Sequence, residues 1–236
     1  MEQKSIINDP RKLDYYYKEA MKTLRTNILY SGKDVKTILV TSYFPDEGKS
    51  DIALQLTRDL GSMGKKVLLF DADIRKSALV RRYSVDQDVK GLSQYLSGQI
   101  QKEEILYDTN YENMHIIFAG PTAPNPAELL EQKLLTDLLK ELRQKYDYII
   151  IDTPPIGSVI DAAIVAKECD GAILVIESDR VRYKDAQRVQ EQLKKTGCRI
   201  LGAVLNKVDV KKDRYYHRYH YYYYADRQKH EEKAEK

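Results

Sequence analysis

The sequence predicts an α/β protein of three layers, in which helices cover both faces of a mostly parallel sheet. Strand and helix signals alternate along most of the 236 residues, and such alternation is typical of a parallel sheet. The expected strands are short and mostly apolar on both faces, as central parallel strands are. The length suits one sizeable domain, and no internal repeat is visible.

Six segments carry a strand signal and five carry a helical signal. The expected strands span residues 37–41, 66–71, 114–119, 148–152, 172–177 and 200–205. The expected helices span residues 15–30, 51–61, 127–145, 161–167 and 184–196. The proline-rich stretch 120–126 cannot be helical, so we expect a rigid loop there.

The two ends of the chain differ from this central region. Residues 1–34 are polar up to Leu13 and then show an amphipathic helical pattern, which predicts an N-terminal helical segment. Residues 35–210 hold the alternating elements and form the expected main domain. Residues 211–236 are charged and rich in tyrosine, which predicts a flexible tail that cannot bury a core.

Composition excludes several classes of protein. The net charge is +3, and residues 211–236 carry this excess with eight Lys/Arg against five Asp/Glu. The rest is nearly neutral, so no basic face and no nucleic-acid partner are expected. No apolar run has transmembrane length, and the N-terminus lacks the apolar core of a signal peptide, which predicts a cytoplasmic chain. Cys169 and Cys198 have neither zinc-ligand nor disulfide-framework spacing.

The most informative stretch is Gly48-Lys49-Ser50, between an expected strand and an expected helix. A strand, a tight loop and a helix N-terminus form a cradle for a nucleoside triphosphate. Lys49 adds a cation for the β- and γ-phosphates, and the Ser50 hydroxyl suits Mg²⁺. The strict motif has glycine where Tyr43 stands, and the tripeptide alone also fits an ordinary turn. The loop residues expected to bind the nucleotide are Asp46, Glu47, Gly48, Lys49, Ser50 and Asp51.

Two further strands end in carboxylates. One ends in Asp71-Ala72-Asp73-Ile74-Arg75, and another ends in Asp152-Thr153-Pro154-Pro155. Each aspartate taken singly could cap a following helix. Because open α/β sheets bind ligands at the carboxyl ends of their strands, these groups are expected beside the phosphate loop. The three motifs together predict a site for ATP and Mg²⁺.

These motifs resemble the deviant Walker branch of P-loop proteins and, more narrowly, the bacterial tyrosine kinases of capsular and exopolysaccharide biosynthesis. That family is marked by Asp-x-Asp-x-Arg after the phosphate loop and by Asp-Thr-Pro-Pro after the Walker B strand. Segments 24–27 and 124–130 also look like family signatures. The resemblance runs from about Glu19 to Asp209 and implies a P-loop fold.

The resemblance implies a protein tyrosine kinase with ATP and Mg²⁺ as cofactors. Ser50, Asp152 and Asp71 would hold the metal. Asp71 would accept the tyrosine proton as general base, and Asp73 would support the metal or the acceptor. Asn206 is similar to the family's adenine contact. The expected catalytic residues are Lys49, Asp71, Asp73, Arg75 and Asp152.

The tail resembles the family's autophosphorylation tails. The expected phosphoacceptors are Tyr215, Tyr216, Tyr219, Tyr221, Tyr222, Tyr223 and Tyr224. Each phosphate adds about −1.5 to −2 charge, so a few would turn the basic tail acidic. Two alternatives are a sticky aromatic tail and a stacking surface for single-stranded nucleic acid.

Glu19, Lys22 and Arg25 fall roughly along one face of the expected N-terminal helix. In the family a Glu-x-x-Arg-x-x-Arg motif at this place packs against a neighbouring subunit of a ring-like homo-oligomer, which brings one subunit's tail to the next subunit's site. Lys22 replaces the first arginine and lacks its bidentate geometry, which predicts weaker oligomerisation. The alternative is an exposed helix with a salt bridge.

The resemblance also implies partners and a location. A separate membrane activator of the polysaccharide co-polymerase type would recruit the kinase to the inner face of the membrane through a cytoplasmic terminus. A cognate tyrosine phosphatase would oppose the kinase, and polysaccharide polymerisation and export would be regulated. The main rival is a nucleotide-switched ATPase of the partition or septum-site kind without tyrosine transfer. Asp71, Asp73, Arg75 and the tyrosine tail disfavour it.

Asp51 departs from the family, which usually has threonine after the Lys-Ser pair. A carboxylate there would repel the triphosphate. Two unit charges 4 Å apart at an effective dielectric of 20 interact by about 4 kcal/mol before screening. The sequence therefore predicts weaker ATP binding than in relatives, or compensation by the metal, and tighter binding in Asp51→Thr.

Overall fold

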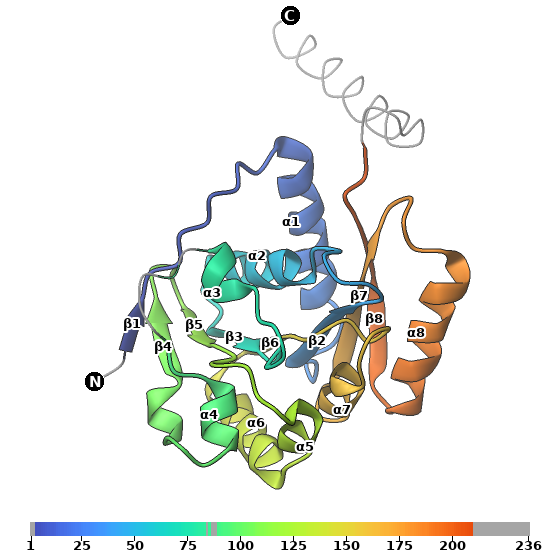
Figure 1. Cartoon of the computed structure of the whole chain (residues 1–236). Coiled ribbons are helices and arrows are strands. Elements are labelled where there is room, and N and C mark those ends of the chain that lie inside the picture. The colour runs from blue at the N-terminus through green and yellow to red at the C-terminus, as the bar shows by residue number, and fades with distance from the viewer. Residues whose placement is uncertain (1–2, 84, 86–88, 210–236) are drawn as a thin grey trace, which may run out of the picture.

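One sheet of eight strands runs through the described residues, 3–83, 85 and 89–209, of the computed structural model (Figure 1). The strands stand in the order β1-β4-β5-β3-β6-β2-β7-β8. All neighbours from β5 to β8 are parallel, and only β4 and β5 pair antiparallel. The strand bounds are β1 Gln3–Ser5, β2 Thr37–Ser42, β3 Val67–Asp71, β4 Leu106–Thr109, β5 Met114–Ile117, β6 Tyr148–Asp152, β7 Gly171–Glu177 and β8 Arg199–Asn206.

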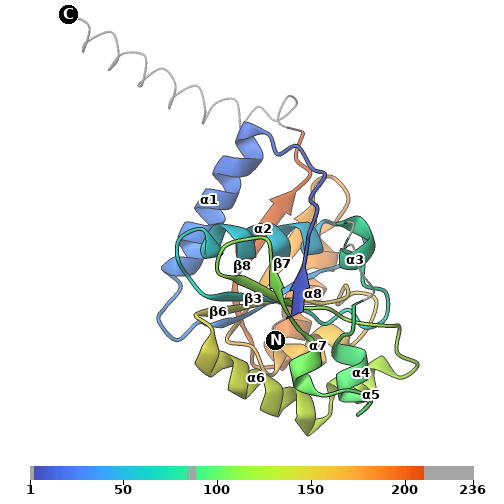
Figure 2. The ribbon, with the colours of Figure 1, turned by 90° about the vertical axis from the view of Figure 1, so that its left-hand side faces the viewer.

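Helices cover both faces of this sheet, so the expected three-layer α/β/α class is confirmed (Figures 1 and 2). On one face lies α2, with α1 packed against it. The other face is covered by α4 to α8. The helix bounds are α1 Tyr15–Leu29, α2 Lys49–Gly61, α3 Leu79–Arg82, α4 Leu92–Leu96, α5 Pro126–Leu130, α6 Lys133–Lys145, α7 Asp161–Ala166 and α8 Tyr183–Lys195, with a 3₁₀ turn at Lys102–Glu104.

The alternation of side chains along the central strands explains the two cores. In β2, Ile38 and Val40 pack under α1 and α2, whereas Leu39 belongs to the core on the opposite face. Successive side chains of a strand point to opposite faces, and all three are fully buried. The sheet is thus a buried central layer, and β2 delivers the phosphate loop from its middle.

The sequence-based elements differ from the structure in three ways. The helix expected over 127–145 is two helices, α5 and α6, because Gln132 has extended backbone angles between them. The strands β1 and β4 were not expected; β1 pairs with the distant β4, and β4 also pairs with β5, its neighbour in sequence. The short helices α3 and α4 were also missed. All six expected strands are present.

The structure describes the N-terminal helix, whereas residues 210–236 lie outside the described range. The N-terminal helix lies at Tyr15–Leu29, close to the expected range 15–30. Residues 211–236, with all seven expected phosphoacceptors, lie outside the described residues. Among the residues that the structure describes, no helix combines the length and the apolar character that a membrane span requires.

Candidate functional site

The phosphate loop joins β2 to α2, and its geometry depends on Gly48. The backbone of Gly48 has φ +92°, a conformation that side chains other than hydrogen disfavour. A Cβ atom there would lie 2.2 Å from Asn206 Nδ2. No side chain caps the first turn of α2, which begins at Lys49. The N–H groups of this turn therefore suit an anion such as a phosphate.

Two side chains hold the loop in place: that of Glu47, within the loop, and that of Asn206, in β8. The buried Glu47 carboxylate accepts hydrogen bonds from the Phe44 amide at 2.5 Å and from the Glu177 amide at 2.8 Å. Asn206, at the end of β8, donates its amide to Glu47 O at 2.8 Å. Glu47 thus holds the loop against β7, a role that was not predicted from the sequence because Glu177 is 130 residues away. The adenine contact of Asn206 stays a prediction.

The acidic strand ends lie beside this loop. Asp71 ends β3, Asp152 ends β6, and the two residues stand opposite each other in the pairing of these neighbouring strands. Lys49 Nζ lies 3.8 Å from Asp152 Oδ1 and 3.8 Å from Asp73 Oδ2. Three motifs that are far apart in the sequence therefore meet at one edge of the sheet, as the sequence analysis expected.

Burial and like charge perturb the ionisation of these groups. Burial, followed by the neighbouring charge of Asp152, raises the pKa of Asp71 to about 8. Burial also raises the pKa of Asp152. Burial opposes the charge of Lys49, but Asp152, Asp73 and Asp71 outweigh it and raise the pKa of the amine. Without a bound cation, the surroundings of Asp71 and Asp152 thus favour the protonated forms of both carboxyl groups.

The donor set fits a hard divalent cation. Asp152 Oδ1 is buried and has no hydrogen-bond partner among the described residues. The buried Ser50 hydroxyl lies 3.3 Å from Lys49 Nζ. Residues 3–83, 85 and 89–209 contain no group of three or more Asp, Glu, His or Cys side chains arranged for a metal. The protein alone would therefore complete only part of a coordination shell, which is usual for Mg²⁺ bound together with phosphates.

In the segment Asp71-Ala72-Asp73, the Asp71 side chain is buried more deeply than that of Asp73. Asp71 is fully buried and accepts hydrogen bonds from the Ser77 hydroxyl and from the Asp73 amide, the latter at 3.1 Å. Asp73 lines a cavity of about 370 Å³ together with Gly48, Lys49, Ser50 and Pro154. A ligand in this cavity would meet Asp73 first, with Asp71 beneath it.

Arg75, the last member of the motif, makes a bidentate ion pair. Its Nε and Nη2 atoms donate to the Asp161 carboxylate at 2.6 and 2.9 Å. Asp161 is fully buried in the first turn of α7. The pair fastens the segment after β3 to α7, and the catalytic assignment of Arg75 stays a prediction. The only sequence signal for Asp161 was its position at the start of an expected helix.

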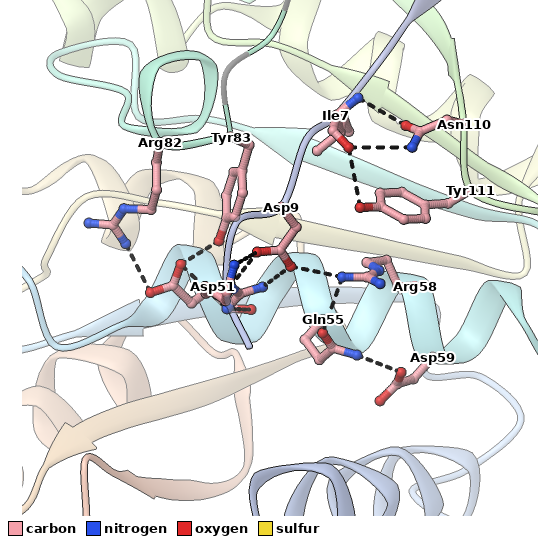
Figure 3. Close-up of polar contacts among 11 residues, drawn as sticks. Ile7, Asp9, Asp51, Gln55, Arg58, Asp59, Arg82, Tyr83, Asn110 and Tyr111 are labelled. Carbon is pink, nitrogen blue, oxygen red and sulfur yellow. Dashed lines mark hydrogen bonds and ion pairs between the residues drawn. The ribbon is translucent and has the colours of Figure 1, made fainter. Parts of the chain in front are cut away.

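Asp51 has partners within the protein. Arg82 Nη1 donates to Asp51 Oδ2 at 3.0 Å, and the Tyr83 hydroxyl donates to Asp51 Oδ1 (Figure 3). Arg11 Nη1 lies 3.5 Å from Asp51 Oδ1. The prediction from sequence was weaker ATP binding or compensation of this carboxylate by the metal. Two arginines stand beside it, while its effect on ATP affinity stays a prediction.

The expected oligomer face lies on α1. Lys22 Nζ contacts Glu19 Oε1 at 2.6 Å, with 57% and 41% of their side chains exposed. Arg25 is partly buried, and its Nε has no hydrogen-bond partner among the described residues. These contacts agree with an exposed helix carrying a salt bridge and leave the use of this face in an oligomer as a prediction.

The fold and the site together define a P-loop protein that binds a nucleotide with a divalent metal. A family model described as an AAA domain matches residues 35–200, which contain the phosphate loop and both acidic strand ends. The structure of the septum site-determining protein MinD from Pyrococcus horikoshii OT3, complexed with Mg-ADP, superposes with a TM-score of 0.65. It is 31% identical and covers 74% of this chain and 71% of that one.

Other relatives narrow the class. Tyrosine-protein kinase CpsD of Streptococcus pneumoniae serotype 4 is 41% identical over 207 residues, which cover 87% of this chain and 91% of that protein. Tyrosine-protein kinase YwqD of Bacillus subtilis is 35% identical over 215 residues, covering 90% and 89%. The kinase domain of Escherichia coli tyrosine kinase ETK has a TM-score of 0.77 at 30% identity, covering 80% and 75%. The chain belongs to the bacterial tyrosine-protein kinases.

Proposed function

We propose that this chain transfers the γ-phosphoryl group of ATP, with Mg²⁺, to tyrosines of its own C-terminal cluster. The observation that carries the proposal is that Lys49 and Asp73 line one cavity beside the phosphate loop, with the buried Asp152 3.8 Å from Lys49 Nζ. A tyrosine-rich segment follows this domain in the sequence and supplies seven acceptors within ten residues, 215–224.

Each residue of the site would have a separate role in phosphoryl transfer. Lys49 and the amides of the loop and of α2 would hold the phosphates, because these groups are positively charged or donate hydrogen bonds. Ser50 and Asp152, with Asp71 nearby, would hold the magnesium ion, which neutralises phosphate charge when bound. Arg75 would keep the acidic motif in place through Asp161.

Asp71 would accept the acceptor's proton. A bond forms between the tyrosine oxygen and the γ-phosphorus, the bond from that phosphorus to ADP breaks, and the phenol proton passes to the Asp71 carboxylate. The raised pKa of Asp71, about 8, lies nearer to that of a phenol, near 10, which favours proton transfer. A hydroxyl group, that of Ser77, already donates to Asp71 Oδ2, and the tyrosine hydroxyl would take its place.

The assembly that we propose is a ring-like homo-oligomer in which the tail of one subunit enters the next subunit's site. Residues 1–34 would supply the contact through Glu19, Lys22 and Arg25, residues 35–210 would catalyse, and residues 211–236 would be the substrate. Because Lys22 cannot make the fork contact of an arginine, we expect a weak oligomer that strengthens with protein concentration. Sedimentation across concentrations would measure this.

We further propose a role in capsular or exopolysaccharide assembly. A relative from Klebsiella pneumoniae is named a putative tyrosine-protein kinase in the cps region, which supports this setting. A separate membrane activator with a cytoplasmic terminus would recruit the chain to the inner membrane face, and a tyrosine phosphatase would reverse the modification. Copurification with the activator's cytoplasmic segment, and its effect on phosphorylation, would test the partner.

Mass spectrometry after incubation with ATP and Mg²⁺ tests the transfer. We expect phosphotyrosine within residues 215–224 and its loss in Lys49→Met. Lys184→Met, which changes an exposed lysine of α8, is the matched control and should keep the modification. Absence of phosphotyrosine from the wild-type chain, with and without an activator segment, would overturn the proposal.

Mixing two variants tests transfer between subunits. Lys49→Met retains the tail but lacks the phosphate-binding lysine, and a chain without residues 211–236 retains the site but lacks the acceptors. We expect the mixture to place phosphotyrosine on Lys49→Met. Modification only when site and tail belong to the same chain would refute transfer in trans.

A nucleotide-switched ATPase without tyrosine transfer is the second candidate. The likeness to MinD, at a TM-score of 0.65, favours it as the alternative. Such a protein would hydrolyse ATP, change its oligomeric state with the nucleotide and leave residues 215–224 unmodified. ATP hydrolysis without phosphotyrosine would therefore select this reading.

A further inference from the structure

Arg82 in α3 lies beside the phosphate loop and has no part in the mechanism above. Its Nη1 donates to Asp51 Oδ2 at 3.0 Å, and its Nη2 lies 3.8 Å from Asp46 Oδ1. Asp46 precedes Gly48 and Asp51 lies in the first turn of α2, so the guanidinium group spans the loop. Arg82 also lines the cavity that Lys49 and Ser50 line.

The two terminal nitrogen atoms of Arg82, Nη1 and Nη2, differ in their contacts. Nη1 makes a hydrogen bond to Asp51, whereas Nη2 lies beyond hydrogen-bond distance from Asp46, whose side chain is 80% exposed. A guanidinium group has five N–H donors in a planar fork and can hold two anions at once. An anion in the cavity could therefore bind Nη2 while Asp51 keeps Nη1.

The Asp51 carboxylate is itself fixed from another side. The Tyr83 hydroxyl donates to it, and Arg11 lies 3.5 Å from it (Figure 3). Arg11 lies in the segment between β1 and α1. Asp9 in this segment accepts hydrogen bonds at 2.8 Å from Arg11 and from Arg58 of α2. The Asp51 carboxylate is thus held in place by donors within the protein and is not an unpaired charge that faces the phosphates.

We propose that Arg82 binds a phosphate oxygen of the bound nucleotide through Nη2, and that Asp51 is the positioning residue that holds Arg82 there. This inference rests on the proposed nucleotide binding and adds a phosphate ligand from α3 to the loop and Lys49. It gives Asp51 a role other than the repulsion expected from sequence. A charged hydrogen bond to phosphate supplies affinity that Mg²⁺ does not replace.

Equilibrium binding of ATP to the full chain, with Mg²⁺ and separately with EDTA, tests the contact. A hydrogen bond to a charged group is worth about a tenfold change in affinity or more, so Arg82→Ala should weaken binding by about that factor in both conditions. Arg82→Lys keeps the charge without the fork and should weaken binding by about threefold. Arg188→Ala, at an exposed arginine of α8, is the matched control and should bind as the wild type does.

The outcomes separate this inference from the proposed function. If Lys49→Met loses ATP while both Arg82 variants stay within about twofold of the wild type, the Arg82 contact is wrong and the nucleotide site stands. If the wild-type chain itself fails to bind ATP, both proposals fall. Thermal unfolding of each variant identifies a folding defect, and Arg82→Lys then decides in place of Arg82→Ala.

A double-mutant cycle tests the role of Asp51. Asp51→Asn removes a negative charge near the phosphates and also loosens Arg82, so the single variant combines two opposed effects. The cycle isolates their coupling. We expect Arg82→Ala to weaken ATP binding by about tenfold beside Asp51 but by about threefold or less beside Asn. Equal factors in the two backgrounds would show that Asp51 does not position Arg82.

Discussion

Aspartates lie at both ends of the parallel strands, but their surroundings shift the pKa in opposite directions. At the carboxyl ends of the strands, Asp71 and Asp152 are buried, their pKa values are raised, and Asp152 Oδ1 has no hydrogen-bond partner among the described residues. At the amino ends, Asp170 Oδ2 accepts hydrogen bonds from the Lys36 and Thr37 amides at 2.9 and 2.8 Å and from Arg143 Nη1 at 2.5 Å.

The pKa of Asp170 reflects these donors. Burial works against its charge, but the hydrogen bonds from Arg143, Thr37 and Lys36 outweigh burial and lower the pKa. Before β6, the Asp147 carboxylate likewise accepts a hydrogen bond from a backbone amide, that of Lys66, at 2.8 Å. An aspartate that the protein supplies with donors joins two strands. A buried carboxylate oxygen without a donor among the described residues, such as Asp152 Oδ1, can instead bind a ligand.

Asp71→Asn gives the largest expected effect. Removal of a general base slows phosphoryl transfer by about 10²- to 10⁴-fold. The same change should raise the melting temperature at pH 7, because the carboxyl group is ionised in the unfolded chain and must take up a proton on folding, whereas an amide has no such cost. Phosphotyrosine formation and thermal unfolding of the purified variant measure the two effects. Transfer near the wild-type rate would exclude Asp71 as the base, and a lower melting temperature would contradict the contrast between the edges.

Asp170→Asn should act in the opposite direction. It weakens three hydrogen bonds at the start of β2 and β7, so we expect the free energy of unfolding to fall by about 2 kcal/mol. Because Asp170 lies at the other edge, the rate of phosphoryl transfer per folded chain should stay within about threefold. Urea denaturation and the transfer assay measure both quantities. A large loss of transfer without loss of stability would show that the two edges are not independent.

The contribution of Asp170 should depend on pH. A carboxyl whose pKa is lowered in the folded state stabilises the fold fully above its unfolded pKa, about 3.9, and loses this contribution as pH falls through the folded value. The difference in unfolding free energy between the wild type and Asp170→Asn should therefore be full at pH 7 and shrink below about pH 4. Urea denaturation at several pH values measures it, and a constant difference would contradict the lowered pKa.

Asp147→Asn should have the smallest effect. Asp147 is exposed, and among the described residues its side chain accepts one hydrogen bond, from the Lys66 amide at 2.8 Å, so water can replace much of the interaction. We expect a loss of unfolding free energy below about 1 kcal/mol. The same urea titration places it beside Asp170→Asn. A larger loss than for Asp170→Asn would contradict the expectation that water replaces much of the interaction at the exposed Asp147.

The sequence by itself determined the central sheet and the meeting of its motifs. Apolar runs such as 37–41 and 148–152 are local signals, and parallel strands bring their carboxyl ends to one edge, which places Lys49 near Asp73 and Asp152. These predictions needed only the short-range pattern and the regular geometry of a sheet.

Only the tertiary structure decided which charged side chains pair. Glu47 meets the Glu177 amide across 130 residues, Arg75 meets Asp161 across 86, and Asp51 meets Arg82 across 31. Each pairing depends on where two separate elements come to rest, and a charged residue looks the same in sequence whether its partner is protein, water or ligand. The strand β1 was missed for the same reason, since its partner β4 lies in a distant segment. The strand β4 pairs with the neighbouring β5 and was missed because its partly exposed residues form no apolar run.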